Sequence, residues 1–246
     1  MMLRTLKIGS FLLLGGLIGC GKSEPTNPTT PANTSAMTAN SEGMKPEDYC
    51  AEFVKDRTSA KTKFQGKEVT LTGKVQGFEL TGEEEAQIIL GNDSLNTVMC
   101  ITAEKQPWAS FSPGQLITVK GKQSAEVTDP QLMECSISPS QPNPAMKVAA
   151  KTLVEEYVAN PAEFQDKYAS KWLAIEGELI AVEKDLGVIL ILKGTESLPI
   201  SCSVLVDFQK AAATLTPGQT VKLLTVCQEQ RSPDRLHFNS CWLITK

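Results

Sequence analysis

The chain has little of what most catalytic sites are built from. It holds one histidine, His237, and it contains no C-x-x-C pair, no G-x-S-x-G turn and no glycine-rich phosphate loop. A metal site built on several histidines is therefore excluded, as are the common nucleophile and phosphate-binding motifs. We expect no catalytic residue, no bound cofactor and no metal site. We interpret His237 as a polar side chain on a strand, since Leu236 and Phe238 flank it.

The first twenty residues have the order of a secretory signal. The basic residues Arg4 and Lys7 precede an apolar run from Ile8 to Ile18, which is shorter than the roughly 20 residues of a membrane-spanning helix. The run ends in Leu17-Ile18-Gly19-Cys20, and this ending resembles the signal of bacterial lipoproteins. The resemblance implies that residues 1–19 are removed. It also implies that Cys20 carries a diacylglycerol thioether and an amide-linked acyl chain such as palmitate, which together anchor the chain to a membrane.

The residues after Cys20 favour a location and a role for this segment. The residue after Cys20 is Gly21 and not aspartate. By the sorting habit of many Gram-negative lipoproteins, this favours the outer membrane, with the protein facing the periplasm. Residues 20–45 are predicted to be a lipidated, disordered tether, because Lys22 to Lys45 is rich in Pro, Thr, Asn, Ser and Ala and has no aromatic residue. A coil of this length has ends roughly 25 to 30 Å apart, so it would keep the remaining chain near the membrane.

An internal repeat divides the rest of the chain into two domains. The block Lys63 to Val75 aligns without gaps on Lys167 to Leu179 at an offset of 104 residues, and the same offset places Ser112-Pro113-Gly114-Gln115 on Thr216-Pro217-Gly218-Gln219. Pro139, Pro142 and Pro144 separate the copies. We therefore predict one domain over residues 46–138, a proline-rich linker over 139–145 and a second domain over 146–246.

The hydrophobic pattern predicts the same elements in both copies. Apolar and polar residues alternate as in half-buried strands, and a helical segment lies between the third and fourth strands. A helix is expected before each first strand, and we interpret Gly73 and Gly177 as points where the long first strand bends. The predicted strands are 69–75, 87–90, 97–101, 116–120 and 132–137 in copy one, and 173–179, 188–192, 200–204, 220–226 and 236–244 in copy two. The prediction is a mainly β (α+β) chain with two tandem five-stranded OB-fold barrels.

Each copy resembles the tRNA-anti-like OB-fold family of bacterial secreted proteins and lipoproteins. In the second copy, residues 145–246, the resemblance rests on the following features: Lys167-Tyr168, the strand from Leu173 to Gly177, Cys202, Thr216-Pro217-Gly218-Gln219 and Cys241. The first copy, residues 44–137, matches more loosely, because it has an acidic loop at residues 82–85 and a shorter central helix. The resemblance implies a nucleic-acid-binding ancestry for the fold, and fold alone does not assign an activity.

Six cysteines remain beside Cys20, an even number that allows fifteen pairings. Disulfides are expected in an exported chain. In the OB topology the third strand lies beside the fifth, so we predict the bridges Cys100–Cys135 and Cys202–Cys241. Cys50 and Cys227 have no cysteine counterpart in the other copy, and a third bridge between these two residues would join the domains. Buried thiols are the alternative for all six.

These observations favour a membrane-anchored, non-catalytic binding or interaction module of the cell envelope. Its partners would be the lipid bilayer, through Cys20, and an envelope protein, an envelope glycan or a small molecule in the concave face of a barrel. The alternative is a single-stranded nucleic-acid-binding OB protein.

Charge and aromatic content oppose that alternative. Removal of Arg4 and Lys7 leaves 22 basic against 28 acidic residues, a net charge of −6. Only Phe78 lies near the second strand of copy one, and the same region of copy two, residues 181–185, has no aromatic residue for stacking. We interpret Trp108, Trp172 and Trp242 as core or seam residues.

We predict that a Cys20→Ser variant no longer fractionates with membranes, because it lacks the residue that would carry the lipid. Fractionation of cells that express the variant and the parent chain tests this expectation. Retention of the variant in the membrane fraction would show that the lipid prediction is wrong.

Overall fold

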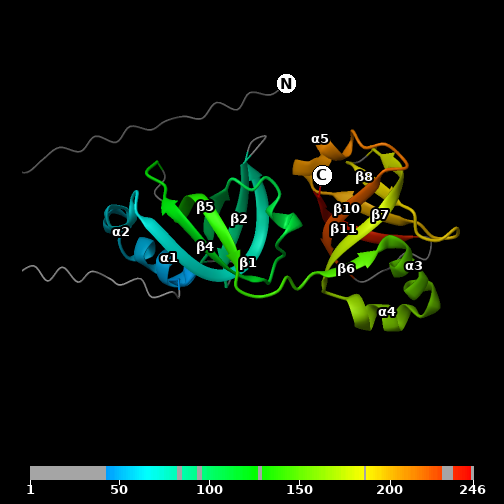
Figure 1. Ribbon diagram of the computed structural model, residues 1–246, viewed down its shortest axis with the longest axis horizontal. Helices are drawn as coiled ribbons and strands as arrows, with labels where there is room; N and C mark the ends of the chain where they lie inside the picture. Colours follow the sequence, from blue (N-terminus) through cyan, green and yellow to red (C-terminus); the bar gives the residue numbers. More distant parts are fainter. Residues whose placement is uncertain are drawn as a thin grey trace, which may run out of the picture. The chain divides into compact units, whose positions relative to one another are not determined.

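Two closed five-stranded β-barrels follow one another along the chain (Figure 1). The structure is a computed structural model, and it describes residues 43–81, 85–92, 96–126, 129–185, 187–228 and 235–244. The predicted signal peptide, Cys20 and the tether up to residue 42 lie outside the described residues, as does most of the acidic loop at 82–85. The described helices include none with the length and apolar character that crossing a membrane requires.

The first barrel has the strand order β1-β2-β3-β5-β4 and closes through pairing of β1 with β4. The β3–β5 pair is parallel and the other pairs are antiparallel. Its elements are α1 (Pro46–Lys55), α2 (Arg57–Phe64), β1 (Glu68–Thr81), β2 (Glu85–Gly91), β3 (Val98–Thr102), η1 (Pro107–Ala109), β4 (Leu116–Gln123) and β5 (Gln131–Pro139).

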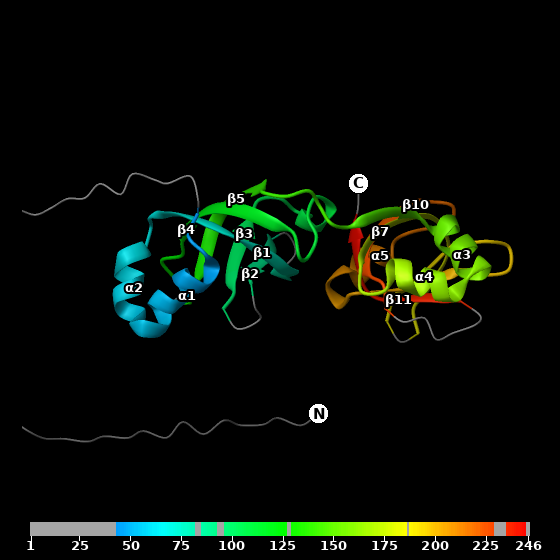
Figure 2. The ribbon, with the colours of Figure 1, turned by 90° about the horizontal axis from the view of Figure 1, so that it is seen from below.

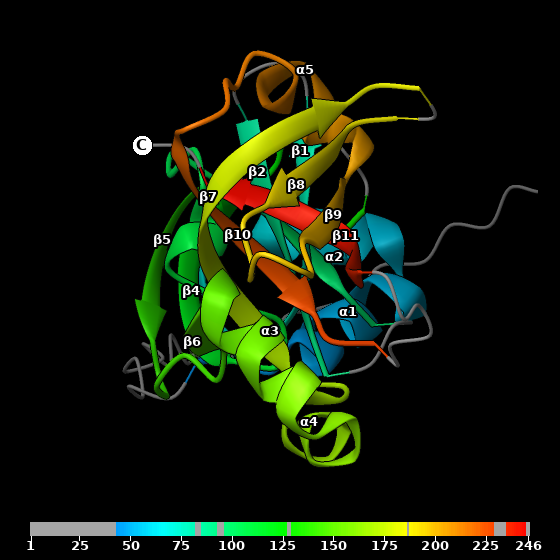
Figure 3. The same cartoon turned by 90° about the vertical axis from the view of Figure 1, so that its right-hand side faces the viewer.

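The second barrel repeats this order with one added strand. Its sheet runs β10-β11-β9-β8-β7-β6 and closes through pairing of β10 with β7, so that β7, β8, β9, β11 and β10 wrap around one core (Figure 3). Its elements are β6 (Met146–Ala149), α3 (Ala150–Ala159), α4 (Pro161–Tyr168), β7 (Trp172–Glu183), β8 (Ile189–Leu192), β9 (Ile200–Val204), η2 (Val206–Phe208), α5 (Gln209–Ala212), β10 (Thr220–Val226) and β11 (Leu236–Ile244). The predicted fold class of two tandem OB barrels is confirmed.

The long first strand of each barrel serves two neighbours. The first half of β1, Glu68–Lys74, pairs with β4, and its second half, Lys74–Thr81, pairs with β2. A bulge between Val75 and Gly77 lies at the change of partner. In the second barrel β7 pairs with β10 and β8 in the same way, and its bulge lies between Leu179 and Ala181. One strand therefore closes the sheet, which removes its open edges.

A pair of helices precedes each first strand, where the sequence predicted a single helix. The second helix of each pair begins at a side-chain cap: Asp56 accepts a hydrogen bond from the backbone of Ser59, and Asn160 accepts one from Glu163. Figure 2 shows α1 and α2 beside the first barrel. A lysine of the second helix pairs with a glutamate of the first in both copies, Lys63 with Glu52 at 2.9 Å and Lys167 with Glu156 at 2.7 Å.

Aromatic side chains hold each helix pair together and cover one end of the barrel core. Tyr49, Phe53 and Phe64 contact one another at ring distances of 4.8 to 6.0 Å, and the Tyr49 hydroxyl donates to Gln123 at the end of β4. In the second copy Phe164 contacts Tyr157 at 5.4 Å and Tyr168 at 4.9 Å. The helices therefore act as lids over the hydrophobic core.

Short strand-like segments before the helices were missed by sequence reasoning. β6 pairs parallel with β7, so that Val148 lies opposite Ile175. In the first copy Met44 pairs in the same sense with Leu71, through hydrogen bonds of 2.9 Å with Thr70 and Thr72. The last residues of the predicted tether therefore belong to the first barrel.

Gly73 and Gly177 permit close contact between a helix and the first strand. A Cβ atom at Gly73 would lie 2.5 Å from Cγ of Pro46, and one at Gly177 would lie 2.7 Å from Cβ of Ala150. Pro46 and Ala150 are the first residues of α1 and α3. The bulges lie further along each strand, and the bend predicted at these glycines stays a prediction. The glycines are required because a helix begins directly on the sheet.

The tryptophans lie in the core and on a seam, as predicted. Trp108 in η1 is 3% exposed, and its indole N–H donates to the carbonyl oxygen of Leu243 in β11 at 2.8 Å. Its ring packs edge-on against Phe208 at 4.7 Å. Trp172 and Trp242 contact each other at 5.3 Å. Trp108 therefore links the two copies by a hydrogen bond and a ring contact.

The linker between the copies is held by its polar side chains. Asn143 accepts a hydrogen bond from the Ser112 hydroxyl at 2.6 Å and donates one to the Ser110 carbonyl at 2.9 Å. The Gln115 side chain donates to the carbonyl oxygen of Gln141 at 3.0 Å. The proline-rich segment is thus fastened to the loop before β4.

A Gly73→Ala substitution is expected to lower the free energy of unfolding by about 2 to 3 kcal/mol, because the added methyl group overlaps Pro46. Gly77→Ala is the matched control on the same strand, since a Cβ there meets only Ile89 Cδ1 at 3.9 Å and should change stability by less than about 1 kcal/mol. Urea unfolding of both variants measures the difference. Equal losses would contradict the close-contact explanation.

Candidate functional site

The outward side of β2, β3 and β5 forms an apolar surface on the first barrel, which we call the first face. Ile88, Leu90, Cys100 and Leu132 point into the core and have no exposed surface. Because side chains alternate along a strand, their neighbours point outward. These outward residues are Gln87, Ile89, Met99, Ile101 and Met133, and all except the buried Gln87 are half-buried.

Glutamates border the first face. Glu79 on β1 lies opposite Gln87, and Glu85 begins β2; both are exposed. At the outward positions of β2 and β3 there is no lysine, arginine or aromatic residue. The first face therefore offers apolar contact with a negative border, and it lacks the groups that bind phosphates and stack on bases.

The corresponding surface of the second barrel, the second face, is more polar. Ile189 and Ile191 of β8 lie beside Ser201 and Ser203 of β9. His237 of β11 lies opposite Ser201 in the parallel pair. The serines occupy the places that Met99 and Ile101 hold in the first face, since each pair flanks the inward cysteine of the third strand. The two copies therefore share a scaffold and present different chemistry.

A chain of hydrogen bonds crosses the second face. The Ser201 hydroxyl lies 2.7 Å from His237 Nδ1, His237 Nε2 lies 2.7 Å from Asn239 Oδ1, and the Asn239 amide donates to Gln228 at 3.1 Å. Because Asn239 Oδ1 can only accept, Nε2 carries the proton and Nδ1 accepts from Ser201. Ser201 has no exposed surface, so its hydroxyl faces the imidazole and not solvent. His237 is a half-buried strand residue, as its sequence context predicts.

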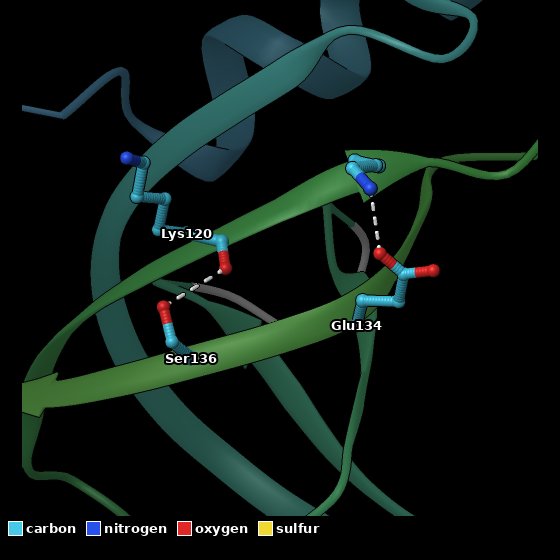
Figure 4. Close-up of polar contacts among 4 residues, drawn as sticks. Lys120, Glu134 and Ser136 are labelled. Carbon is cyan, nitrogen blue, oxygen red and sulfur yellow. Dashed lines mark hydrogen bonds and ion pairs between the residues drawn. The ribbon is translucent and has the colours of Figure 1, made fainter.

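Lysines on the wall of the first barrel are paired with glutamates. Lys120 contacts Glu68 at 2.8 Å and Lys122 contacts Glu134 at 2.7 Å. Figure 4 shows Glu134 and Ser136 on β5 beside Lys120 on β4, where the Ser136 hydroxyl donates to the Lys120 carbonyl at 3.3 Å. The hydrogen bond from Lys122 lowers the pKa of Glu134, and the same bond raises the pKa of Lys122. Both lysines therefore form ion pairs with carboxylates of the same barrel.

A hollow of about 730 Å³ lies beside β6, β7 and β10. Val148, Ala149 and Ile175 supply apolar lining, and Ala109 of the first copy lies at its border. Lys222 lines the same hollow and pairs with Glu176 at 3.2 Å. The hollow is therefore lined by apolar side chains and by one ion pair.

Two of the three predicted cysteine pairs lie, as thiols, on the adjoining third and fifth strands of a barrel. The neighbouring Cys135 thiol, followed by burial, raises the pKa of Cys100, and Cys241 and burial raise the pKa of Cys202 in the same way. Cys50 lies near Cys100, and its thiol donates to the Thr97 carbonyl at 3.5 Å.

No disulfide joins Cys50 to Cys227, the third predicted pair. Burial raises the pKa of Cys227, at the end of β10, to about 11, and its thiol contacts the Gln228 carbonyl at 3.6 Å. The described contacts of Cys50 and Cys227 include none between these two residues. No disulfide joins any of the six described cysteines. Cys20 lies outside the described residues, and within the described part no cluster of His, Cys, Asp or Glu is suited to a metal ion.

The repeated Pro-Gly-Gln motif has a structural role in both copies. Gly114 and Gly218 have positive φ angles of 84° and 89°, and their amides donate at 2.8 Å to Val75 and Leu179 beside the bulge of the first strand. The next side chain closes the turn, because Gln115 accepts from the Ser112 amide at 3.2 Å and Gln219 from the Thr216 amide at 3.0 Å. The motif fastens the turn before the fourth strand to the first strand.

A family model described as tRNA_anti-like matches residues 8–137. This segment contains the first copy, whereas the sequence analysis expected the second copy to match better, so that expectation is corrected. The first-strand glycine and the Pro-Gly-Gln turn occur in both copies, which explains why either can carry the resemblance. No curated protein matches the chain.

Solved structures with a similar fold differ strongly in sequence. A lipoprotein from Klebsiella pneumoniae, described as a candidate nucleic-acid-binding protein, is 11% identical over 41% of this chain and 92% of its own, with a TM-score of 0.37. The S. pombe Stn1–Ten1 complex is 14% identical over 30% of this chain and 58% of its own, with a TM-score of 0.27. An OBody bound to hen egg-white lysozyme is 15% identical over 32% and 83%, with a TM-score of 0.28. Sequence identities and TM-scores this low give no information about a shared ligand.

The two glutamines of the repeated turn predict unequal stabilities. Gln115 is 2% exposed and also holds Gln141 of the linker, so Gln115→Ala should lower the free energy of unfolding by about 2 kcal/mol. Gln219 is exposed, and Gln219→Ala should cost less than about 1 kcal/mol. Thermal and urea unfolding of the two variants provides the comparison. A larger loss for Gln219→Ala would refute this assignment.

Proposed function

The chain belongs to the tRNA_anti-like family, and from that premise we propose that it is a non-catalytic, lipid-anchored binding protein of the bacterial cell envelope. Its partner is an envelope protein, which it holds on the first face. The observation that carries the proposal is the chemistry of that face, where Ile89, Met99, Ile101 and Met133 lie half-buried on adjoining strands. Flexible methionines beside isoleucines suit contact with an apolar protein segment, since methionine adapts its shape to the surface that it covers.

The charges around the first face support a partner of defined character. Glu79 and Glu85 are exposed at its border, and the outward positions of β2 and β3 contain no lysine or arginine. A segment with apolar side chains at its centre and basic residues at its ends would complement this pattern. The partner is therefore proposed to present an apolar surface edged by lysine or arginine.

The second face supports a role without catalysis. The side chain that most resembles a nucleophile, Ser201, is buried, and its hydroxyl is engaged with His237. Asn239 and Gln228 complete the hydrogen-bond chain. A catalytic serine must reach its substrate, and these groups instead satisfy one another.

The proposed location rests on the N-terminal sequence. The signal-like residues before Cys20 and the polar segment after it are typical of an exported chain with a lipid and a tether. An outer-membrane anchor facing the periplasm would keep both barrels close to that membrane. The first face would then meet other proteins of the same compartment.

Single-stranded nucleic-acid binding is the alternative, and the family description is what favours it. The barrel surface favours it less, because Lys120 and Lys122 are paired with glutamates and the outward positions of the second and third strands have no aromatic residue. The two functions differ in salt dependence, since phosphate binding weakens steeply as the salt concentration rises.

The proposal predicts a specific crosslink from the first face. A photoreactive amino acid at Ile101 in the full chain, expressed in cells, should give one discrete protein adduct that survives nuclease treatment. The same group at Thr220, an exposed residue of β10, is the control and should give none. A Met99→Asp substitution should reduce the Ile101 adduct at least about tenfold, because it places a charge in the apolar contact.

Two results would contradict the proposal. One is an equal yield of adducts from Ile101 and Thr220. The other is micromolar binding of a fluorescent single-stranded oligonucleotide by the purified full chain at low salt, measured by anisotropy and lost as salt is raised, which would favour the alternative.

A further inference from the structure

The same seam of both barrels contains a pair of buried cysteines. Cys100 lies on the third strand and Cys135 on the fifth strand of the first barrel; Cys202 and Cys241 lie on the corresponding strands of the second. Cys100, Cys202 and Cys241 have no exposed surface, and Cys135 is 5% exposed. The third and fifth strands run parallel, and parallel pairs are slightly less stable than antiparallel ones.

A bulge with an unusual backbone angle lies beside the second cysteine of each pair. Glu134, directly before Cys135, has a φ of 54°, and Ser240, directly before Cys241, has the same value. The register shifts at these points, between Cys100 and Thr102 in the first barrel and between Phe238 and Cys241 in the second. A left-handed residue other than glycine is costly and persists only where the surroundings require it. In both copies the cysteine that follows this residue is buried.

The surroundings of the first pair leave room for its sulfur atoms. A Cβ atom at Gly121 of β4 would lie 2.7 Å from Cys135 Sγ, so only glycine fits beside this thiol. Cys135 pairs with Thr102, two residues after Cys100, and Cys241 pairs with Val204, two residues after Cys202. The bulge and the register that place the two cysteines on adjoining strands are therefore the same in two copies whose outward faces differ.

We infer that Cys100 with Cys135, and Cys202 with Cys241, are oxidation sites that close as disulfides and lock the third strand to the fifth in each barrel. Cys50 and Cys227 keep their thiols in this proposal. Each pair loses two protons and two electrons as one S–S bond forms. The electrons pass to a dithiol–disulfide oxidant, whose own S–S bond breaks through a mixed disulfide and takes up two protons as two thiols.

The bridge would act directly behind the first face. Cys100 lies between Met99 and Ile101 on β3, and Cys135 follows Met133 on β5. Those outward residues therefore belong to the two strands that the disulfide would join. Reduction would loosen the seam that carries the proposed binding surface, while the antiparallel pairs of the barrel remain.

Peptide mapping of the full chain with the substitution Cys20→Ser, which leaves the six cysteines of the barrels, tests this proposal. The purified reduced chain is refolded in a buffer of oxidised and reduced glutathione, denatured with N-ethylmaleimide and digested without reductant. The expected products are two bridged peptide pairs, Cys100 with Cys135 and Cys202 with Cys241, and label on Cys50 and Cys227. Label on all six residues, or a bridge that includes Cys50 or Cys227, would overturn the proposal.

Thermal stability gives an independent readout. Dithiothreitol should lower the Tm of the oxidised chain and of a Cys50→Ala control by roughly 5 to 10 °C for each bridge that it opens. A Cys100→Ala, Cys135→Ala double variant should respond to reductant through the second barrel only, with the shift of one bridge, about half of the total for two bridges. A full-size shift in the double variant would contradict the assignment to Cys100 and Cys135. Both readouts use the purified chain, so they do not depend on the proposed partner or membrane location.

Discussion

Each barrel depends on a first strand that changes its pairing partner halfway along its length. β1 pairs with β4 up to Lys74 and with β2 beyond it, and β7 divides in the same way between β10 and β8. The change requires a bulge, and the bulge frees backbone groups that need partners. The Pro-Gly-Gln turn supplies them in both copies, since Gly114 and Gly218 donate to the residue at that point. The closed core, the helix that begins on the strand and the outward faces all follow from this arrangement.

The residues that the two copies share are those that close each barrel, whereas the residues on the outward faces differ. The first-strand glycine, the turn and the left-handed residue before the last cysteine occur in both copies. On the third strand, in contrast, Met99 and Ile101 flank one inward cysteine and Ser201 and Ser203 flank the other. The residues shared by the two copies therefore explain how each barrel closes. Any difference in function between the copies lies in the residues that the repeat does not share.

Much of the fold could be predicted from sequence, because a strand that buries one face shows an alternation of apolar and polar residues along the chain. The second helix of each pair was missed since α2 is mostly polar and buries only Ala60 and Phe64. β6 was missed because four residues are too few to show a period. The glycines were noticed, but their contact with the start of a helix was not predicted, since a contact between residues far apart in the sequence leaves no local pattern. The faces could not be predicted, because the bulge before Cys135 and before Cys241 shifts which residues of β5 and β11 point outward.

The pairing of Met44 with β1 has a mechanical consequence. Met44 forms two hydrogen bonds with the strand, and Pro46 rests on Gly73 two residues further along. A pull on the N-terminal segment therefore reaches the sheet at Leu71 before it reaches the helices. The force is carried into the half of β1 that is bonded to β4, and it reaches α1 and α2 after the sheet. A pull on the residues before Met44 would therefore load the sheet of the first barrel before it loads the lid over the core.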